Sequence, residues 1–192
     1  MISNDIFIVI SSKGGVGKTT FSTQYLIPFI YEETKKPVAI YEYDEVNFST
    51  QYLKDSKIIA TNVIKSSQKD FTEFEKKVQN ILFDLDRDYP VVIDIGAENY
   101  RTAINDLVSN LSLSMKTKIH FFIPILVGLE DAPILIKVIK EIRSIVKDPN
   151  IIVVLSKANS PLENRTNPDE LSEIEDEFYL PLGLSYNYKK GE

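Results

Sequence analysis

Five runs of apolar residues recur along the chain, and longer stretches with many polar positions separate them. The runs span residues 6–10, 38–43, 91–95, 119–126 and 151–155. Runs that are apolar nearly throughout are typical of strands buried on both faces, as in a parallel sheet. The stretches between them are long enough for crossover helices. The pattern therefore predicts an α/β fold, a three-layer α/β/α sandwich around a mainly parallel sheet.

The segment after the first apolar run is rich in glycine and predicts a phosphate-binding loop. Residues 11–20 read Ser-Ser-Lys-Gly-Gly-Val-Gly-Lys-Thr-Thr. Glycines let several backbone N–H groups converge on one polyphosphate, because side chains would block the approach or forbid the dihedrals. Lys18 supplies a charge for the β- and γ-phosphates, and the Thr19 hydroxyl is placed to ligate Mg²⁺. The expected nucleotide-binding residues of the loop are Gly14, Gly15, Val16, Gly17, Lys18, Thr19 and Thr20.

The spacing of these glycines departs from the ordinary Walker A motif, which requires a glycine where this chain has Ser12. Residues 13–20 instead read K-G-G-V-G-K-T-T, with a second lysine, Lys13, ahead of the glycines. This run resembles the deviant Walker A motif of the ParA/MinD family of P-loop ATPases. In that family the early lysine crosses a dimer interface and touches the phosphates bound by the partner subunit. The resemblance therefore implies an ATP-dependent homodimer in which Lys13 and Lys18 both act in catalysis.

Carboxylates at the C-terminal ends of two of the apolar runs are candidates to complete the site. Such acids normally hold Mg²⁺ and position water beside a phosphate loop. Asp94 in Val-Val-Ile-Asp-Ile-Gly fits a Walker B strand and is expected to bind Mg²⁺ with Thr19, while Gly96 permits a switch loop. Asp44 ends Ile-Tyr-Glu-Tyr-Asp, which resembles the family's Walker A′ segment except that Glu42 replaces an aspartate. The resemblance makes Asp44 the catalytic carboxylate.

Selection of the base depends on the segment after the last apolar run. Family members often place an asparagine and a lysine there, whereas this chain has Ser156 and then Lys157. With the usual asparagine replaced, the candidate adenine contacts are Asn159 and a backbone group near Pro181. The preference for adenine over guanine rests mainly on the family resemblance.

The resemblance also implies a biological role. ParA-type proteins segregate plasmids or move other cargo by cycling between an ATP-bound dimer and a released monomer, commonly with a DNA-bound adaptor that triggers hydrolysis. Residues 44–48, D-E-V-N-F, look like a pattern of the small TraL/StbB-like branch, which is found with plasmid transfer and stability genes. We therefore expect a slow ATPase acting in plasmid partition, mobilisation or conjugal transfer, or cargo positioning.

Two alternatives remain open from the sequence. One is a small-molecule kinase or ATP-dependent ligase, similar to the dethiobiotin synthetases that share this scaffold, although Lys13 speaks against it. The other is a nucleotide-sensing module that binds ATP and never turns it over. Substrate-dependent ADP release without dimerisation would favour the first, and a dimer that never releases phosphate would favour the second.

Composition limits the number of domains, the class of protein and the compartment that we expect. The 192 residues carry a formal charge of −6, 43% of them are hydrophobic, and none is cysteine. The length favours one domain over residues 1–192, and the lack of cysteine excludes iron–sulfur carriers and suits a reducing compartment. Residues 1–5 have no basic signal-peptide start, the longest apolar stretch is too short to span a bilayer, and residues 186–192 do not resemble MinD's membrane helix. We expect a cytoplasmic protein that does not bind membranes.

A predicted helix over residues 131–147 carries a candidate interaction surface. Five apolar residues recur on one side at helical spacing: Ile134, Val138, Ile142, Ile145 and Val146. Four cations gather on the other side. They are Lys137, Lys140, Arg143 and Lys147. This basic face is suited to DNA phosphates or an acidic partner, although a solvated helix surface is the commoner reason for such a pattern. Arg101, a few residues after Asp94, is a further candidate contact for an activator or for the second subunit.

Overall fold

The computed structural model describes residues 4–44, 53, 56–59, 64–65, 76, 88–108, 118–126 and 131–156. Contacts within the chain divide it into two units, Met1–Lys157 and Ala158–Glu192, and the second unit lies outside the described residues. The description that follows concerns the first unit. A single domain over the whole chain stays a prediction.

Six strands form one sheet in which every described pair is parallel. They are β1 (Ile6–Val9), β2 (Ala39–Tyr43), β3 (Ile64–Lys65), β4 (Val91–Ile95), β5 (Ile119–Leu126) and β6 (Asn150–Ser156). Their order across the sheet is β3-β2-β4-β1-β5-β6. The five strands predicted from the apolar runs are confirmed. The sixth, β3, is two residues long, which is too short for a periodic signal in the sequence.

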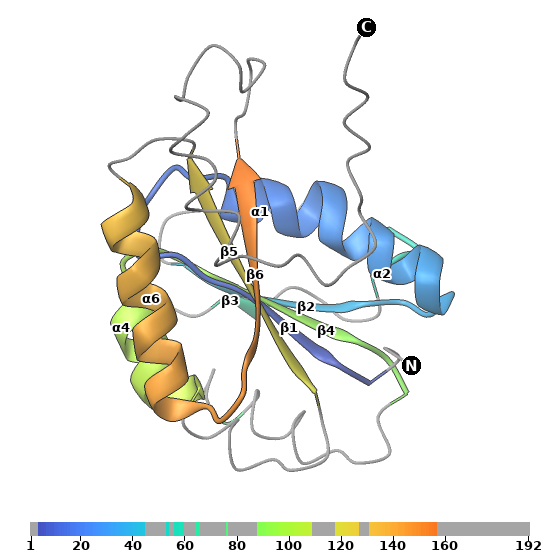
Figure 1. Cartoon of the computed structure of the whole chain (residues 1–192). Helices are drawn as coiled ribbons and strands as arrows, with labels where there is room; N and C mark the ends of the chain where they lie inside the picture. The colour runs from blue at the N-terminus through green and yellow to red at the C-terminus, as the bar shows by residue number, and fades with distance from the viewer. Residues whose placement is uncertain are drawn as a thin grey trace, which may run out of the picture. The chain divides into compact units, whose positions relative to one another are not determined.

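Helices cover both faces of this sheet (Figure 1). One continuous helix consists of α1 (Lys18–Phe21), the π-helical turn η1 (Ser22–Leu26) and α2 (Ile27–Thr34). Pro28 explains the wide turn before it, because its ring displaces the carbonyl four residues earlier and it has no N–H to donate. On the other face lie α4 (Tyr100–Thr102), the π-helical η4 (Ala103–Val108) and α6 (Ala132–Ile145). The layered architecture is the predicted α/β sandwich.

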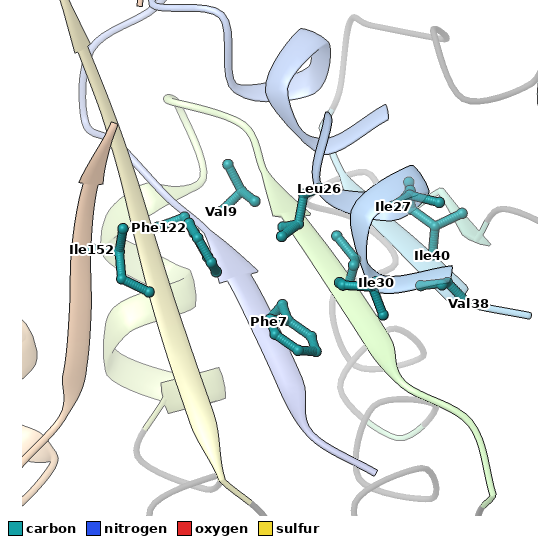
Figure 2. Packing of buried hydrophobic residues seen from close by; sticks show 10 residues of the cluster. Phe7, Val9, Leu26, Ile27, Ile30, Val38, Ile40, Phe122 and Ile152 are labelled. Atoms are coloured by element: carbon teal, nitrogen blue, oxygen red, sulfur yellow. The ribbon is translucent and has the colours of Figure 1, made fainter. Parts of the chain in front are cut away.

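The core under the α1–α2 helix is built from alternate residues of the central strands. Leu26, Ile27 and Ile30 of the helix pack on Phe7 and Phe122 of the sheet (Figure 2). On the other face α6 buries Leu135, Val138, Ile139 and Ile142. We had expected Ile134, Ile145 and Val146 in the buried stripe of α6, and each of them is partly exposed instead. The stripe is rotated toward Leu135 and Ile139 because the sheet lies on that side.

A polar cluster is buried at the edge of the sheet where the strands begin. His120 Nε2 lies 3.0 Å from Asp5 Oδ2, and His120 Nδ1 lies 2.6 Å from Asn150 Nδ2. The His120 ring stacks on Phe7 with a centroid distance of 4.9 Å. Asp5 directly precedes β1, His120 lies in β5 and Asn150 in β6, so the histidine links the starts of three strands.

Register places the opposite edge, where the strands end, at the phosphate loop. Val9 of β1 pairs with Asp94 of β4, and Glu42 of β2 pairs with the same Asp94. Paired residues of a parallel sheet point to the same face, so both carboxylates face the side covered by the α1–α2 helix. The sheet thereby brings β1, β2 and β4 together around the start of that helix.

Candidate nucleotide site

The phosphate loop joins the end of β1 to the first turn of α1. Gly15 has φ +70° and Gly17 has φ +89°, which is the left-handed region that favours glycine. Gly17 is also the residue at which the helix begins, and its carbonyl accepts the first helical hydrogen bond, from Phe21 N–H at 2.8 Å. Val16 is buried and anchors the loop, whereas Gly14 and Thr20 are exposed. The loop has the backbone that phosphate binding requires, at the positive end of a long helix.

Lys18 lies under the loop, and only 8% of the residue is exposed. Its ammonium group donates a hydrogen bond to the Lys13 carbonyl at 3.0 Å. Burial lowers the pKa of Lys18, and the nearby Asp94 and Asp44 carboxylates oppose this shift. The structure therefore brings the predicted phosphate lysine together with both predicted acids.

Asp94 is a deeply buried acid of the site with a perturbed pKa. It is 2% exposed, and among the described residues neither of its carboxylate oxygens has a hydrogen-bond partner. Burial raises the pKa of Asp94 to about 7; the nearby Glu42 carboxylate adds to this rise, and Thr19 and Lys18 oppose it. The nearby Thr19 hydroxyl lowers the pKa of Asp94, although it does not reach ordinary hydrogen-bond geometry with the carboxylate.

These properties fit the predicted magnesium site. A buried carboxylate without a partner, beside a threonine hydroxyl at the start of the helix, supplies the oxygen ligands that Mg²⁺ prefers. Within the described ranges, no group of three or more His, Cys, Asp or Glu side chains is arranged to hold a metal. Water and phosphate oxygens would complete the coordination shell, as is usual for this ion.

Asp44 lies directly after β2, against the turn that follows β4. A side chain at Gly96 would place its Cβ 2.9 Å from the Asp44 Cγ and 3.1 Å from the Tyr43 carbonyl oxygen. The Gly96 N–H donates to that carbonyl at 2.7 Å. The absence of a side chain at Gly96 therefore lets the two strand ends approach closely. This close approach sets the position of Asp44 beside Lys18.

Glu42 is a site residue whose importance the sequence did not reveal. It is fully buried, and as the register partner of Asp94 it adds a second carboxylate to the same face of the sheet. The available signal was a charged residue inside an apolar strand, which is uncommon unless the charge has a partner or a ligand. From the sequence it was treated only as a departure from the family pattern.

Lys13 makes an ion pair within its own chain. Its ammonium contacts Asp131 Oδ1, and the other oxygen of Asp131 accepts a hydrogen bond from the Leu126 N–H at 3.1 Å. Asp131 was not identified as a site residue from the sequence. It stands two positions before Pro133 at the start of α6, a pattern that indicates a helix N-cap. In the structure its side chain makes no capping hydrogen bond.

The end of β6 also reaches the loop. A Cβ at Gly17 would lie 3.6 Å from the Ser156 Oγ, so the residue that replaces the family's asparagine contacts the start of the helix. Asn159, Pro181 and residues 45–48 lie outside the described residues. The structure therefore places Ser156 and leaves the Asn159 contact to adenine as a prediction.

The four cations of α6 and its C-terminal end are all exposed: Lys137, Lys140, Arg143 and Lys147. Arg101 is exposed as well and lines a shallow cavity of about 200 Å³ between η4 and α6, together with Ile104, Glu141 and Ser144. The Tyr100 hydroxyl donates to Glu141 beside this cavity. In the part of the chain that the structure describes, no helix has the length and apolar character needed to cross a membrane.

Comparisons with known proteins rest on solved structures, because no family model and no curated protein matches the sequence. The chain is similar to a plasmid partition protein from Borrelia burgdorferi, with 18% identity and a TM-score of 0.57, over 90% of this chain and 86% of that chain. It is also similar to a putative plasmid partition protein from Borrelia burgdorferi B31 bound to AMPPNP. That match has 18% identity and a TM-score of 0.52, over 92% of each chain.

Similarity at this level of identity identifies a fold. It agrees with the strand order, with the all-parallel pairing of the described strands and with the loop between β1 and α1. The chain therefore has the α/β P-loop fold that these two proteins share.

Proposed function

We propose that this protein is a Mg²⁺-dependent ATPase of the ParA type, which dimerises with ATP and hydrolyses it slowly. The observation that carries the proposal is the convergence of Lys18, Asp94 and Asp44 at a phosphate loop that also holds Lys13. The Lys18 ammonium bonds a carbonyl of the loop in the free protein, and it can replace this contact with hydrogen bonds to phosphate oxygens. The similar partition protein that binds AMPPNP, an ATP analogue, supports adenine nucleotide as the ligand.

Each residue of the proposed nucleotide site has a separate role. Backbone N–H groups of residues 14–20 and the Lys18 ammonium bind the phosphates, and Asn159 contacts the base. Thr19 and Asp94 hold Mg²⁺, which when bound neutralises phosphate charge. Asp44, fixed against Gly96, orients the attacking water. Lys13 reaches the nucleotide of the partner subunit, so the monomer alone has an incomplete site and turns over slowly.

The role we propose is plasmid partition, mobilisation or conjugal transfer, or cargo positioning in the cytoplasm. An adaptor or DNA-bound partner would stimulate hydrolysis. The exposed cations of α6 are the candidate contact to DNA, and Arg101 beside the η4–α6 cavity is the candidate contact to an activator. Tyr100 joins this cavity to the turn after Asp94, which gives such a partner a route to the nucleotide site.

The deciding experiment is size-exclusion chromatography with light scattering on the Asp44→Ala protein, in Mg²⁺ with either ATP or ADP. Blocking hydrolysis should trap the state that ATP favours, so we expect a dimer with ATP and a monomer with ADP. Lys18→Ala in the same background is the control that should remain monomeric with both nucleotides. A monomer under all conditions would contradict the dimerisation switch and favour a small-molecule kinase or ATP-dependent ligase. A wild-type dimer that releases no phosphate, even with its partner, would favour a nucleotide-sensing module.

A further inference from the structure

The phosphate loop is held at both of its lysines by contacts within the chain. The Lys18 ammonium bonds the Lys13 carbonyl at 3.0 Å, and the Lys13 ammonium pairs with Asp131. One lysine therefore restrains the backbone of the other, while Asp131 restrains the side chain. Phosphate binding to Lys18 competes with the first contact, whereas the Asp131 ion pair still restrains the Lys13 side chain.

This ion pair differs from the surface pairs of the molecule. The Asp131 side chain is 4% exposed and the Lys13 side chain 34% exposed, whereas Lys35 and Glu32 are 70% and 67% exposed. Both Asp131 oxygens are in use, since the second accepts the Leu126 N–H at the end of β5. The carboxylate is thus held in place from the sheet, and the lysine is the member of the pair that is accessible to solvent and able to leave.

We propose that Asp131 is a positioning residue that retains Lys13 on its own subunit and so opposes its transfer to the nucleotide of a partner subunit. The inference rests on the proposed function for the destination of Lys13, and on the observed ion pair for its starting point. When Lys13 leaves, Asp131 remains nearly buried without a cation, which costs more than breaking an exposed pair. The free energy of ATP-dependent dimerisation must offset the cost of leaving Asp131 without its cation.

The substitution Asp131→Asn separates the two contacts of the carboxylate. An asparagine oxygen still accepts the Leu126 N–H, so the end of β5 and the start of α6 stay joined, while the charge that attracts Lys13 is removed. Asp88→Asn is the matched control, because it makes the same charge change at the exposed Lys36–Asp88 pair away from the loop. Unchanged circular dichroism and thermal midpoint would establish that both variants fold.

The first measurement is the ATP-driven monomer–dimer equilibrium in the Asp44→Ala background, by light scattering over a protein concentration series. Adding Asp131→Asn should lower the concentration for half-maximal dimerisation by about 25-fold, because each dimer breaks two such pairs and each contributes about fivefold. Asp88→Asn should leave it unchanged. An Asp131→Asn protein that dimerises no more readily than its parent would overturn the proposal.

A second measurement is independent of dimerisation. In the nucleotide-free monomer, the acetylation rate of Lys13 by acetic anhydride is followed by mass spectrometry, with Lys137 as the internal exposed reference. Asp131→Asn should raise the Lys13 rate relative to Lys137 severalfold, and Asp88→Asn should not. If ATP never produces a dimer of the parent protein, the proposed function fails; if Lys13 labelling is insensitive to Asp131→Asn, the assignment of Asp131 fails.

Discussion

The two edges of the sheet contain buried polar side chains with opposite degrees of pairing. Where the strands begin, His120 has Asp5 on one ring nitrogen and Asn150 on the other, and its ring stacks on Phe7. Where the strands end, neither oxygen of Asp94 has a hydrogen-bond partner among the described residues, although this side chain is more deeply buried than His120.

This difference separates a structural cluster from a binding site. Buried polar groups cost free energy unless they are paired, so a paired cluster contributes to folding by itself. An unpaired buried carboxylate destabilises the free protein and is retained where a ligand supplies the missing partner. The first edge therefore holds three strands together, and the second contains the unpaired carboxylate that we propose as a Mg²⁺ ligand.

The largest expected effect concerns the unpaired edge. The pKa of Asp94 is raised to about 7 in the folded protein, above its value in the unfolded chain. The folded state thus binds the proton more tightly, and the contribution of Asp94 to stability is complete below about pH 4 and is lost as the pH rises toward 7. The loss is on the order of 4 kcal/mol for a shift of this size.

Urea unfolding of the nucleotide-free protein between pH 5 and 8 measures this dependence. Asp94→Asn should remove most of the decline in the free energy of unfolding and should make the protein more stable than wild type at pH 8. The same substitution should weaken Mg²⁺-dependent nucleotide binding. Equal pH profiles for the two proteins would show that Asp94 does not cause the pH dependence of the free energy of unfolding.

Lys18→Ala tests the same edge through its ligand. Loss of a charge-assisted contact of about 3 kcal/mol should weaken ATP binding roughly a hundredfold. Titration of a fluorescent ATP analogue gives the dissociation constant, and Lys36→Ala, at an exposed pair, is the matched control. Retained affinity in Lys18→Ala would mean that the loop does not bind the phosphates through this lysine.

Lys13→Ala should retain nucleotide binding and lose the ATP-dependent dimer.

His120→Ala should affect the paired edge alone. It leaves Asp5 and Asn150 without their shared partner and removes the stack on Phe7, which we expect to lower the free energy of unfolding by about 2 kcal/mol. Affinity for ATP in the folded protein should not change, because the cluster lies at the other edge of the sheet. Urea unfolding and nucleotide titration on the same samples give both quantities, and a matching loss of affinity would refute the separation of the two edges.

The smallest effect is expected at the turn beside Asp44. Gly96→Ala places a methyl group 2.9 Å from the Asp44 Cγ and should displace that carboxylate at a cost of about 1 kcal/mol. Steady-state phosphate release should fall severalfold while ATP affinity stays within about a factor of two, because Asp44 is assigned to water rather than to phosphate. A fall in affinity with unchanged turnover would assign Asp44 to binding instead.

The sheet was predictable because strands buried on both faces leave a continuous apolar signal. The phosphate loop was predictable because its glycines and Lys18 are neighbours in sequence as well as in space. The basic face of α6 was also visible, while its buried stripe was misplaced toward Ile134 and Val146, since the direction of the sheet is not encoded in helical periodicity. Residues such as Asn159 lie outside the described part and stay predictions.

By itself, the sequence determined the fold class, the loop and the placement of two acids at strand ends, all of which depend on local order along the chain. Tertiary structure decided which charged residues lie together. Strand register places Glu42 beside Asp94, and Lys13 pairs with Asp131, which is 118 residues away in the sequence. Such pairings depend on register and on the docking of α6, and both are set by packing between segments that are distant in sequence. For this reason the partner of Lys13 within its own subunit emerged only from the folded chain.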